Sequence, residues 1–420
     1  MAPNPAIMEA VEKLGYRVTP GDVAAQAGLN VELAQQGLLA LATDVGGHMQ
    51  VAESGDIVYL FPKNFQSILR NKFFQIKLKE WWEKIWGVIF YLIRISFGVV
   101  LIASIALISI AIMVIIIGSL FSSDGDAPSI GGDSGGGSGG GGGGWFYFPD
   151  IFWYLSPDYD THYQQRRREK KELNFFEAIF SFLFGDGNPN PHLEKRRWQS
   201  IAKVIRRNQG AIVGEQISPY LDDIGPGYAQ EYEDYMLPVL TRFNGQPKVS
   251  PEGEIVYYFP ELQITTRKRP RPPASKFLEE LPWRFSAASS GQIILAVGLG
   301  GVNLVGALVL GNLLKTAAIA GGFIGFVQGI YWLLLFYGVG FLTIPLIRYF
   351  WIQWRNSKIN IRNQSRASRA QLLAIADSKL KEKINFARQF ASQKVIGQKD
   401  IAYTTEEELL EQEFNHKLKE

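Results

Sequence analysis

Two long apolar blocks constrain this 420-residue chain more than any other feature of its sequence. The first block runs from about Ile85 to Phe121 and the second from about Ser290 to Trp351. A helix needs about 20 apolar residues to cross the hydrocarbon core of a bilayer, so both blocks are long enough to span a membrane. The sequence therefore predicts a mainly α-helical integral membrane protein.

Charges within the blocks predict about three transmembrane helices. Arg94 separates an interfacial stretch rich in Trp and Lys from an uncharged span over 97–120. Lys315 marks a turn in the second block, which predicts spans over 291–313 and 318–348.

Small and polar residues in the second block suggest how these spans pack. Gly321, Gly325 and Gly329 are four residues apart, a spacing that lets a neighbouring helix approach closely. Asn303 and Gln328 are expected to form hydrogen bonds across helices, because lipid offers them no partner. The expected helix-packing residues are therefore Gly321, Gly325, Gly329, Asn303 and Gln328.

The basic residues around the blocks give conflicting orientations. Lys and Arg precede the first block but are absent over 122–144, which indicates a cytoplasmic N-terminus and an external loop. The second block has Lys and Arg at both ends, so both of its flanks also look cytoplasmic. One span between the flanking segments cannot satisfy both inferences. We expect all soluble parts to lie on the cytoplasmic side.

The chain contains an internal repeat. VAESGDIVYLFP (Val51 to Pro62) matches VSPEGEIVYYFP (Val249 to Pro260) at seven of twelve positions. In both copies, helical segments precede a β hairpin whose polar turn is Gly55-Asp56 or Gly253-Glu254. This order predicts two small α+β winged-helix-like units, the first module (1–62) and the second module (186–265).

The first module contains a well-marked helix. Asn30 is a plausible cap for a helix from Val31 to Thr43. The apolar residues expected to form its buried side are Leu33, Leu38, Leu39 and Leu41.

The remaining segments complete the predicted domain order. They are an interfacial plus transmembrane helix (63–121), a Gly-rich linker (122–144), an aromatic and basic membrane-proximal segment (145–185), a basic Pro-rich linker (266–289), a transmembrane pair (290–351) and a helical soluble tail (352–420). The basic run in the membrane-proximal segment is a candidate for anionic headgroups, and a solvated charge run is the alternative. Its candidate membrane-surface residues are Arg166, Arg167, Arg168, Lys170 and Lys171.

The residues of common enzyme and metal sites are largely missing. There is no cysteine, which excludes thiolate metal sites and cysteine nucleophiles, and the four histidines have no metal-ligand spacing. We therefore expect no catalytic residues, no metal and no cofactor, and we interpret the chain as a non-enzyme.

Acidic modules argue against nucleic acid as a partner. The first module has no Lys or Arg over 18–62, and the second is strongly acidic over 211–260. DNA affinity depends on Lys and Arg at the contact face, so protein binding is the favoured role. The candidate protein-binding residues are Asp222, Asp223, Tyr228, Glu231, Tyr232, Glu233, Asp234 and Tyr235.

Several stretches resemble a cyanobacterial and plastid family of polytopic membrane proteins. They are the glycine-rich loop running into WFYFPDIFWYL, the motif FSFLFGDGNPNP, and YGVGFLTIPLIRYFWIQWRN. Plant chloroplast-envelope members of that family carry an iron–sulfur-cluster-biosynthesis label, although a chain without cysteine cannot hold a cluster in the usual way. The resemblance implies a location in a thylakoid, plasma or chloroplast envelope membrane.

Three functional hypotheses follow from the sequence. The leading one is a membrane-anchored adaptor or assembly factor, whose partners are membrane lipid and proteins, including a membrane complex or a second copy of the chain. The alternatives are a membrane-tethered transcription regulator, which requires a basic face on the modules, and a transporter or channel component, which the lack of acidic groups in the spans disfavours.

Overall fold

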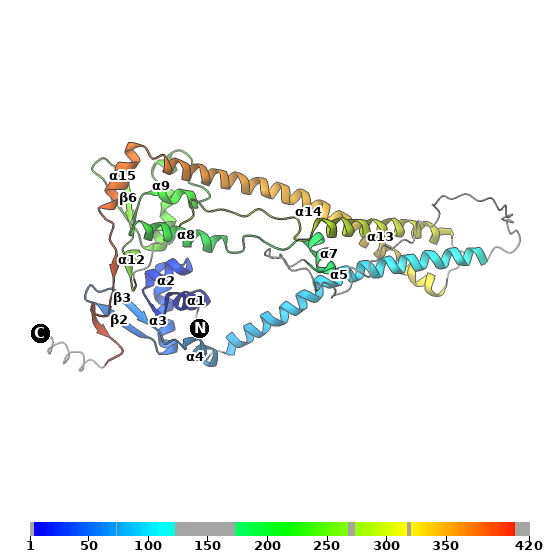
Figure 1. The fold of residues 1–420 in the computed structure, drawn as a ribbon, viewed down its shortest axis with the longest axis horizontal. Helices are drawn as coiled ribbons and strands as arrows, with labels where there is room; N and C mark the ends of the chain where they lie inside the picture. Colours follow the sequence, from blue (N-terminus) through cyan, green and yellow to red (C-terminus); the bar gives the residue numbers. More distant parts are fainter. Residues whose placement is uncertain (1–3, 73, 122–172, 268–273, 317–320, 408–420) are drawn as a thin grey trace, which may run out of the picture. The chain divides into compact units, whose positions relative to one another are not determined.

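The computed structural model describes residues 4–72, 74–121, 173–267, 274–316 and 321–407 (Figure 1). The chain divides into two compact units. Unit 1 comprises Met1–Lys84, Pro189–Pro282 and Asn356–Glu420, and unit 2 comprises Ile85–Asn188 and Trp283–Arg355. Segments that are far apart in the sequence therefore build each unit.

The first module consists of three helices and a small antiparallel sheet. Its elements are α1 (Pro5–Leu14), β1 (Arg17–Val18), α2 (Pro20–Ala27), α3 (Val31–Val45), β2 (His48–Ala52) and β3 (Ile57–Leu60). The strands lie in the order β1-β3-β2, and β2 and β3 form the predicted hairpin. A further helix, α4 (Phe65–Lys72), follows the sheet.

Local capping explains where these helices begin and end. The Thr19 hydroxyl accepts a hydrogen bond from the backbone N–H of Asp22 at the start of α2. Asn30 caps α3 as predicted, because its side chain accepts a hydrogen bond from Glu32 N at 2.8 Å. α3 ends at Gly46, whose φ of +64° is a left-handed conformation that glycine adopts without strain.

The second module repeats this order of elements. It contains α8 (Leu193–Arg207), β4 (Ala211–Ile212), α9 (Gly214–Ile217), α10 (Tyr228–Glu231), α11 (Leu237–Phe243), β5 (Gln246–Val249) and β6 (Ile255–Tyr258). Its sheet has the order β4-β6-β5, which corresponds to β1-β3-β2. The place of α3 is taken by α10, the 3-10 turn Asp234–Met236 and α11, and Pro238 lies in the first turn of α11, where proline needs no backbone partner.

The two modules share one hydrophobic core. α2 packs against α8 and against the short helix α12 (Pro260–Gln263). The approach is so close that a Cβ added to Gly21 would lie 2.0 Å from the carbonyl oxygen of Glu261. An ion pair of 2.8 Å joins the buried Asp22 of α2 to the partly buried Arg206 of α8. The two modules therefore form a single folded unit rather than two independent domains.

The C-terminal part of the chain, which we call the arm (356–404), adds elements to both modules. It contains the end of α14 (Gly322–Ala374), α15 (Ser378–Arg388), β8 (Lys394–Val395) and β9 (Ile401–Thr404). β9 pairs antiparallel with β2, β8 pairs in parallel with β7 (Ile264–Thr265), and α15 packs on β4 and β6 (Figure 1). The prediction of a purely helical tail over 352–420 was therefore incomplete, because two short strands dock on existing edges.

Unit 2 contains the apolar helices. Within the part of the chain that the structure describes, three helices are long and apolar enough to cross a membrane, as predicted. They are α5 (Phe74–Phe121), α13 (Ser290–Thr316) and α14. α5 is continuous through Arg94, and Lys315 lies in the last turn of α13. A ten-residue helix, α7 (Phe175–Phe184), packs against α13 and buries Phe175, Ile179 and Phe182 in the same cluster as Leu101 of α5.

Arg348 fixes the end of α7. Its guanidinium donates hydrogen bonds to the carbonyl oxygens of Ser181, Phe182 and Phe285 at 3.2, 2.8 and 2.6 Å. The last carbonyls of a helix lack partners within the helix, so a cation is a favourable cap. One charged side chain of α14 therefore holds α7 within unit 2.

Over the described residues, the protein is thus mainly α-helical, with three candidate membrane spans and small sheets.

Candidate protein-binding surface

The candidate acidic residues of the second module have two different environments. Glu233 is buried, with 8% of its surface exposed, and Tyr235 is partly buried. Asp223, Glu231, Tyr232 and Asp234 are exposed, and Tyr232 is 52% accessible. Another candidate, Tyr228, begins α10, and its side chain lies outside the described residues.

Glu233 belongs to an internal charge cluster with the arm. Lys383 of α15 has a side chain that is only 5% exposed. Its Nζ donates to Glu233 Oε1 at 2.5 Å and to Glu215 Oε1 at 2.9 Å. A third carboxylate, Glu254, lies 3.8 Å from the same nitrogen and 2.7 Å from Lys379 Nζ. The acidic face is therefore used, in part, to hold α15.

The electrostatics of the cluster follow from one ammonium facing two close carboxylates. Burial disfavours the charged form of Lys383, but Glu215 and Glu233 outweigh it and raise the pKa of the ammonium. Burial, together with the nearby charge of Glu215, raises the pKa of the Glu233 carboxyl against the attraction of Lys383. The lysine thus stays charged, and Glu233 holds a proton more readily than an exposed glutamate.

Asp222 belongs to a second cluster that holds the end of α14. Arg366 of α14 has a fully buried side chain and forms an ion pair with Asp222. The same guanidinium donates to the Leu278 carbonyl oxygen at 2.9 Å and lies 3.8 Å from Glu280. Burial opposes ionisation of Asp222, yet Arg366 and Arg197 lower the pKa of its carboxyl. Asp222 is therefore a structural contact in this chain.

A surface on α3 was missed by the sequence analysis. Leu38 and Leu41 are buried as predicted, but Leu33 and Leu39 are 58% and 54% exposed, so the prediction of their burial was wrong. The helical periodicity contained the signal, because Leu33 and Leu39 lie off the stripe formed by the buried residues Val31, Ala34, Leu38, Leu41, Ala42 and Val45.

The start of α3 lies near α11 of the second module, which also has an exposed leucine. The Asn30 side chain donates a long hydrogen bond of 3.4 Å to the Thr241 carbonyl oxygen, which brings the start of α3 to the end of α11. We define the α3–α11 surface by its exposed residues Glu32, Leu33, Gln35, Gln36, Leu39, Ala40, Thr43, Leu237, Pro238 and Thr241. Leu237 is 60% exposed. The surface has three exposed leucines, one carboxylate and no Lys or Arg.

The expected helix-packing residues of unit 2 are only partly in contact. Asn303 is 1% exposed, and its Oδ1 accepts a hydrogen bond of 2.8 Å from Ser104 of α5, which is a bond across helices as predicted. Gln328 is exposed on α14, so the structure does not give it the cross-helix role expected from the sequence.

The glycine spacing did not identify the close helix contacts. Gly325 is partly buried, but a Cβ added to Gly321 or Gly329 would meet no atom of the described residues within 4 Å. Close approaches instead occur at Gly300, beside Phe341, and at Gly338, beside the backbone of Leu304. Gly321 and Gly329 therefore make no close contact with the other described helices, whereas Ile324 and Val327 of α14 pack in the core.

The basic run Arg166, Arg167, Arg168, Lys170 and Lys171 lies outside the described residues. Within residues 4–72, 74–121, 173–267, 274–316 and 321–407, no group of three or more His, Cys, Asp or Glu side chains is arranged to hold a metal ion. The chemistry available at the α3–α11 surface is therefore apolar contact and hydrogen bonding.

Comparison with known proteins gives one close relationship. The uncharacterised chloroplastic protein At5g03900 of Arabidopsis thaliana is 39% identical over 425 residues, which cover 97% of this chain and 79% of the relative. No protein-family profile and no solved structure matches the chain. The match supports the plastid part of the resemblance expected from the sequence. By its identity and coverage, the chain belongs to the same plastid protein family as this chloroplastic Arabidopsis protein.

Proposed function

We propose that the protein is a non-enzymatic membrane-anchored adaptor or assembly factor that binds a protein partner through the α3–α11 surface. The observation that carries this proposal is the exposure of Leu33, Leu39 and Leu237 on adjoining helices of a well-packed unit. Exposed apolar side chains that gather on one face, rather than scatter singly, are typical of protein interaction sites. The partner should present an apolar face of its own.

The order of elements supports winged-helix modules. Both modules follow the order helix, strand, helix, helix, hairpin, and α3 occupies the position that enters the DNA major groove in helix-turn-helix proteins. DNA contact requires Lys or Arg there, and the exposed face of α3 has neither. Arg242 of α11 is partly buried and stacks 4.1 Å from the centre of the Trp198 ring. These features favour a protein over nucleic acid.

The shared core of the two modules supports a topology in which both lie on one side of the membrane. Two modules that bury residues against each other must lie on the same side of the membrane. With both modules on one side, the chain must cross the membrane an even number of times between Lys84 and Pro189, and we assign one of these crossings to α5. α13 and α14 supply two crossings between Pro282 and Asn356, which returns the arm to the same side. We place this side on the cytoplasm, or on the stroma in a plastid, because Lys and Arg flank the spans there.

The absence of native cysteine makes the topology directly testable. Ser54→Cys and Glu252→Cys each place one thiol in an exposed hairpin turn of a different module. A membrane-impermeant maleimide applied to sealed vesicles of one orientation should label both thiols or neither. Labelling of one and protection of the other would refute the same-side topology.

The binding proposal is tested by affinity purification from the native membrane in mild detergent, followed by mass spectrometry. The test variant is Leu33→Glu/Leu39→Glu, and the control is Ile375→Glu, which makes the same chemical change at a residue that is 80% exposed and outside the surface. A protein partner should co-purify near-stoichiometrically with the wild type and the control, and at least tenfold less with the test variant.

Two results would overturn the binding proposal. One is equal recovery of every co-purifying protein with all three chains. The other is salt-sensitive co-purification of DNA in place of a protein, which would favour the membrane-tethered transcription regulator.

A further inference from the structure

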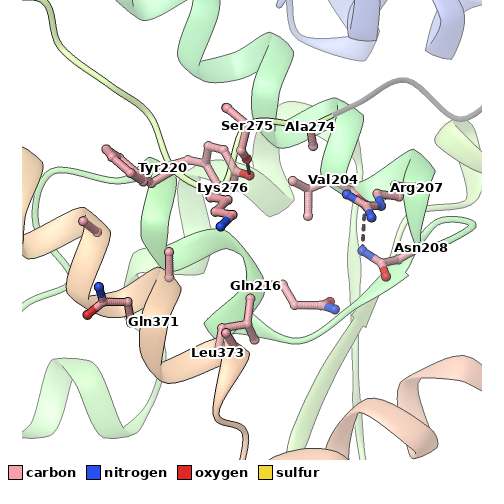
Figure 2. Close-up of a pocket in the computed structure, with 14 residues that line it drawn as sticks. Val204, Arg207, Asn208, Gln216, Tyr220, Ala274, Ser275, Lys276, Gln371 and Leu373 are labelled. Carbon is pink, nitrogen blue, oxygen red and sulfur yellow. Dashed lines mark hydrogen bonds between the residues drawn. The ribbon is translucent and has the colours of Figure 1, made fainter.

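Unit 1 contains a pocket of about 530 Å³ between α8, the segment 274–277 and the end of α14 (Figure 2). Figure 2 shows Val204 and Arg207 of α8, with the following Asn208, on one side and Gln371 and Leu373 of α14 on the other. The volume falls within the range of about 300–1,000 Å³ that is typical of small-molecule sites. The pocket is separate from the α3–α11 surface.

The wall of the pocket is apolar, and its charged groups are cations. Val204, Phe277 and Leu373 line it, together with alanines of α14. Arg207 and Lys276 also line it, and both are exposed. No carboxylate lines the pocket, and within the described residues neither cation forms an ion pair. Two unneutralised cations beside an apolar wall favour an anion that carries an apolar body.

A neighbouring pocket strengthens the positive character of this region. It has a volume of about 470 Å³ and shares Ser275, Lys276 and Phe277 with the first pocket. It adds Arg196 and Lys203, with Glu279 as its single carboxylate. Across both pockets the lining thus has four cations and one acid.

Internal hydrogen bonds fix the walls. The buried Tyr220 hydroxyl donates to the Ser275 carbonyl oxygen, and Leu278 N donates to the Pro219 carbonyl oxygen at 3.2 Å. Gln216 accepts from Val213 N at 3.2 Å through Oε1, so its side-chain amide N–H₂ is the end left to donate. The segment that carries Lys276 is therefore held in place before any ligand arrives.

We propose that this pocket binds a small organic anion, a carboxylate or phosphate monoester with an aliphatic or aromatic body. The Arg207 guanidinium matches the two oxygens of such a headgroup in a forked arrangement, and Lys276 adds a point charge. The apolar body of the ligand packs against Val204, Phe277 and Leu373, which removes its surface from contact with water. Gln216 and Gln371 also line the pocket and can orient the headgroup by hydrogen bonds.

The test uses the full chain in phosphatidylcholine nanodiscs, with the heat of titration into empty nanodiscs subtracted. The probe is 8-anilinonaphthalene-1-sulfonate, and its neutral counterpart is N-phenyl-1-naphthylamine. Saturable binding of the sulfonate at one site, at least tenfold tighter than the neutral probe, supports the proposal. Dodecyl phosphate should displace the sulfonate, and inorganic phosphate at the same concentration should not. Equal displacement by inorganic phosphate would overturn the requirement for an apolar body.

Two variants assign this binding to the pocket. Arg207→Gln/Lys276→Gln should weaken it at least tenfold, whereas Lys381→Gln/Lys399→Gln removes two exposed positive charges elsewhere in the arm and should not. Ala370→Trp fills the pocket from α14 and should abolish binding while the thermal unfolding curve is retained. If all variants bind the sulfonate as the wild type does, the pocket is not the site and the proposal fails.

Discussion

Replacing Lys383 by Met should release α15 from the second module. Lys383 is buried, lies 2.5 Å from Glu233 and 2.9 Å from Glu215, and methionine keeps most of its volume. Removing one partner of a buried ion pair costs about 3–5 kcal/mol, because the other charge stays buried without compensation. The lower limit of this range applies here, because the Glu215 side chain is partly exposed to solvent and Glu233 can take up a proton. We therefore expect a loss of about 3 kcal/mol.

Hydrogen exchange of the full chain in detergent measures this loss locally. About 3 kcal/mol corresponds to roughly a hundredfold faster exchange of the amides in Ser378–Arg388, if opening of α15 limits their protection. Lys379→Met is the matched control, because it makes the same change one turn earlier at a side chain that is 76% exposed, and it should leave that exchange unchanged.

A second variant separates charge from packing. Glu233→Gln/Lys383→Met removes both members of the closest pair, so it should recover a large part of the protection lost in Lys383→Met. Unchanged exchange in Lys383→Met would refute the reasoning. It would mean that the apolar contacts of Leu380, Ile384 and Phe386 hold α15 without help from the charge cluster.

The same lysine predicts a pH dependence with a definite sign. The pKa of Lys383 is raised in the folded state above its ordinary value of 10.5. A raised pKa means that its contribution to stability is complete below pH 10.5 and is lost as the pH rises through the folded value. The difference in thermal stability between wild type and Lys383→Met should therefore be constant from pH 7 to pH 10 and shrink above 10.5. A difference that stays constant to higher pH would contradict this assignment.

Two further substitutions test packing in each unit. Gly21→Ala places a Cβ against the backbone of Glu261 and should destabilise unit 1 by about 3 kcal/mol in thermal unfolding. The control is Gly291→Ala, which has open space around the added methyl group and should not lower the melting temperature. Equal melting temperatures of the two variants would refute the close approach at Gly21. Asn303→Leu removes the hydrogen bond to Ser104 and should destabilise unit 2 by about 1 kcal/mol in detergent unfolding, and Ser104→Ala should match it if that bond is the cause.

The sequence predicted the elements that have local signals. The hairpins β2–β3 and β5–β6 follow from alternating apolar residues around Gly55 and Gly253, and α3 follows from its cap at Asn30. The candidate membrane-spanning helices follow from the length of the apolar blocks alone. These features depend on residues that are near one another in the chain, so a single sequence contains them.

The long-range contacts had no such signal. Lys383 lies 150 positions after Glu233, and nothing local to either residue indicates that they meet. The sequence therefore predicts a free acidic surface on the second module, whereas Asp222 and Glu233 bind the arm. β9 is likewise only four residues long, and only its edge position beside β2 makes it a strand.

The pairing of β9 with β2 has a consequence for how the protein is made. β2 ends at Ala52 and β9 begins at Ile401, so about 350 residues are synthesised between the two strands. At about 5–20 residues per second, the edge of β2 stays open for roughly 20–70 s while α5, α13 and α14 emerge. An open strand edge is a template for wrong pairing with other chains. β9, which covers this edge, is synthesised only after α14, the last apolar helix. The sheet of the first module can therefore be completed only in a chain whose apolar helices have all been synthesised.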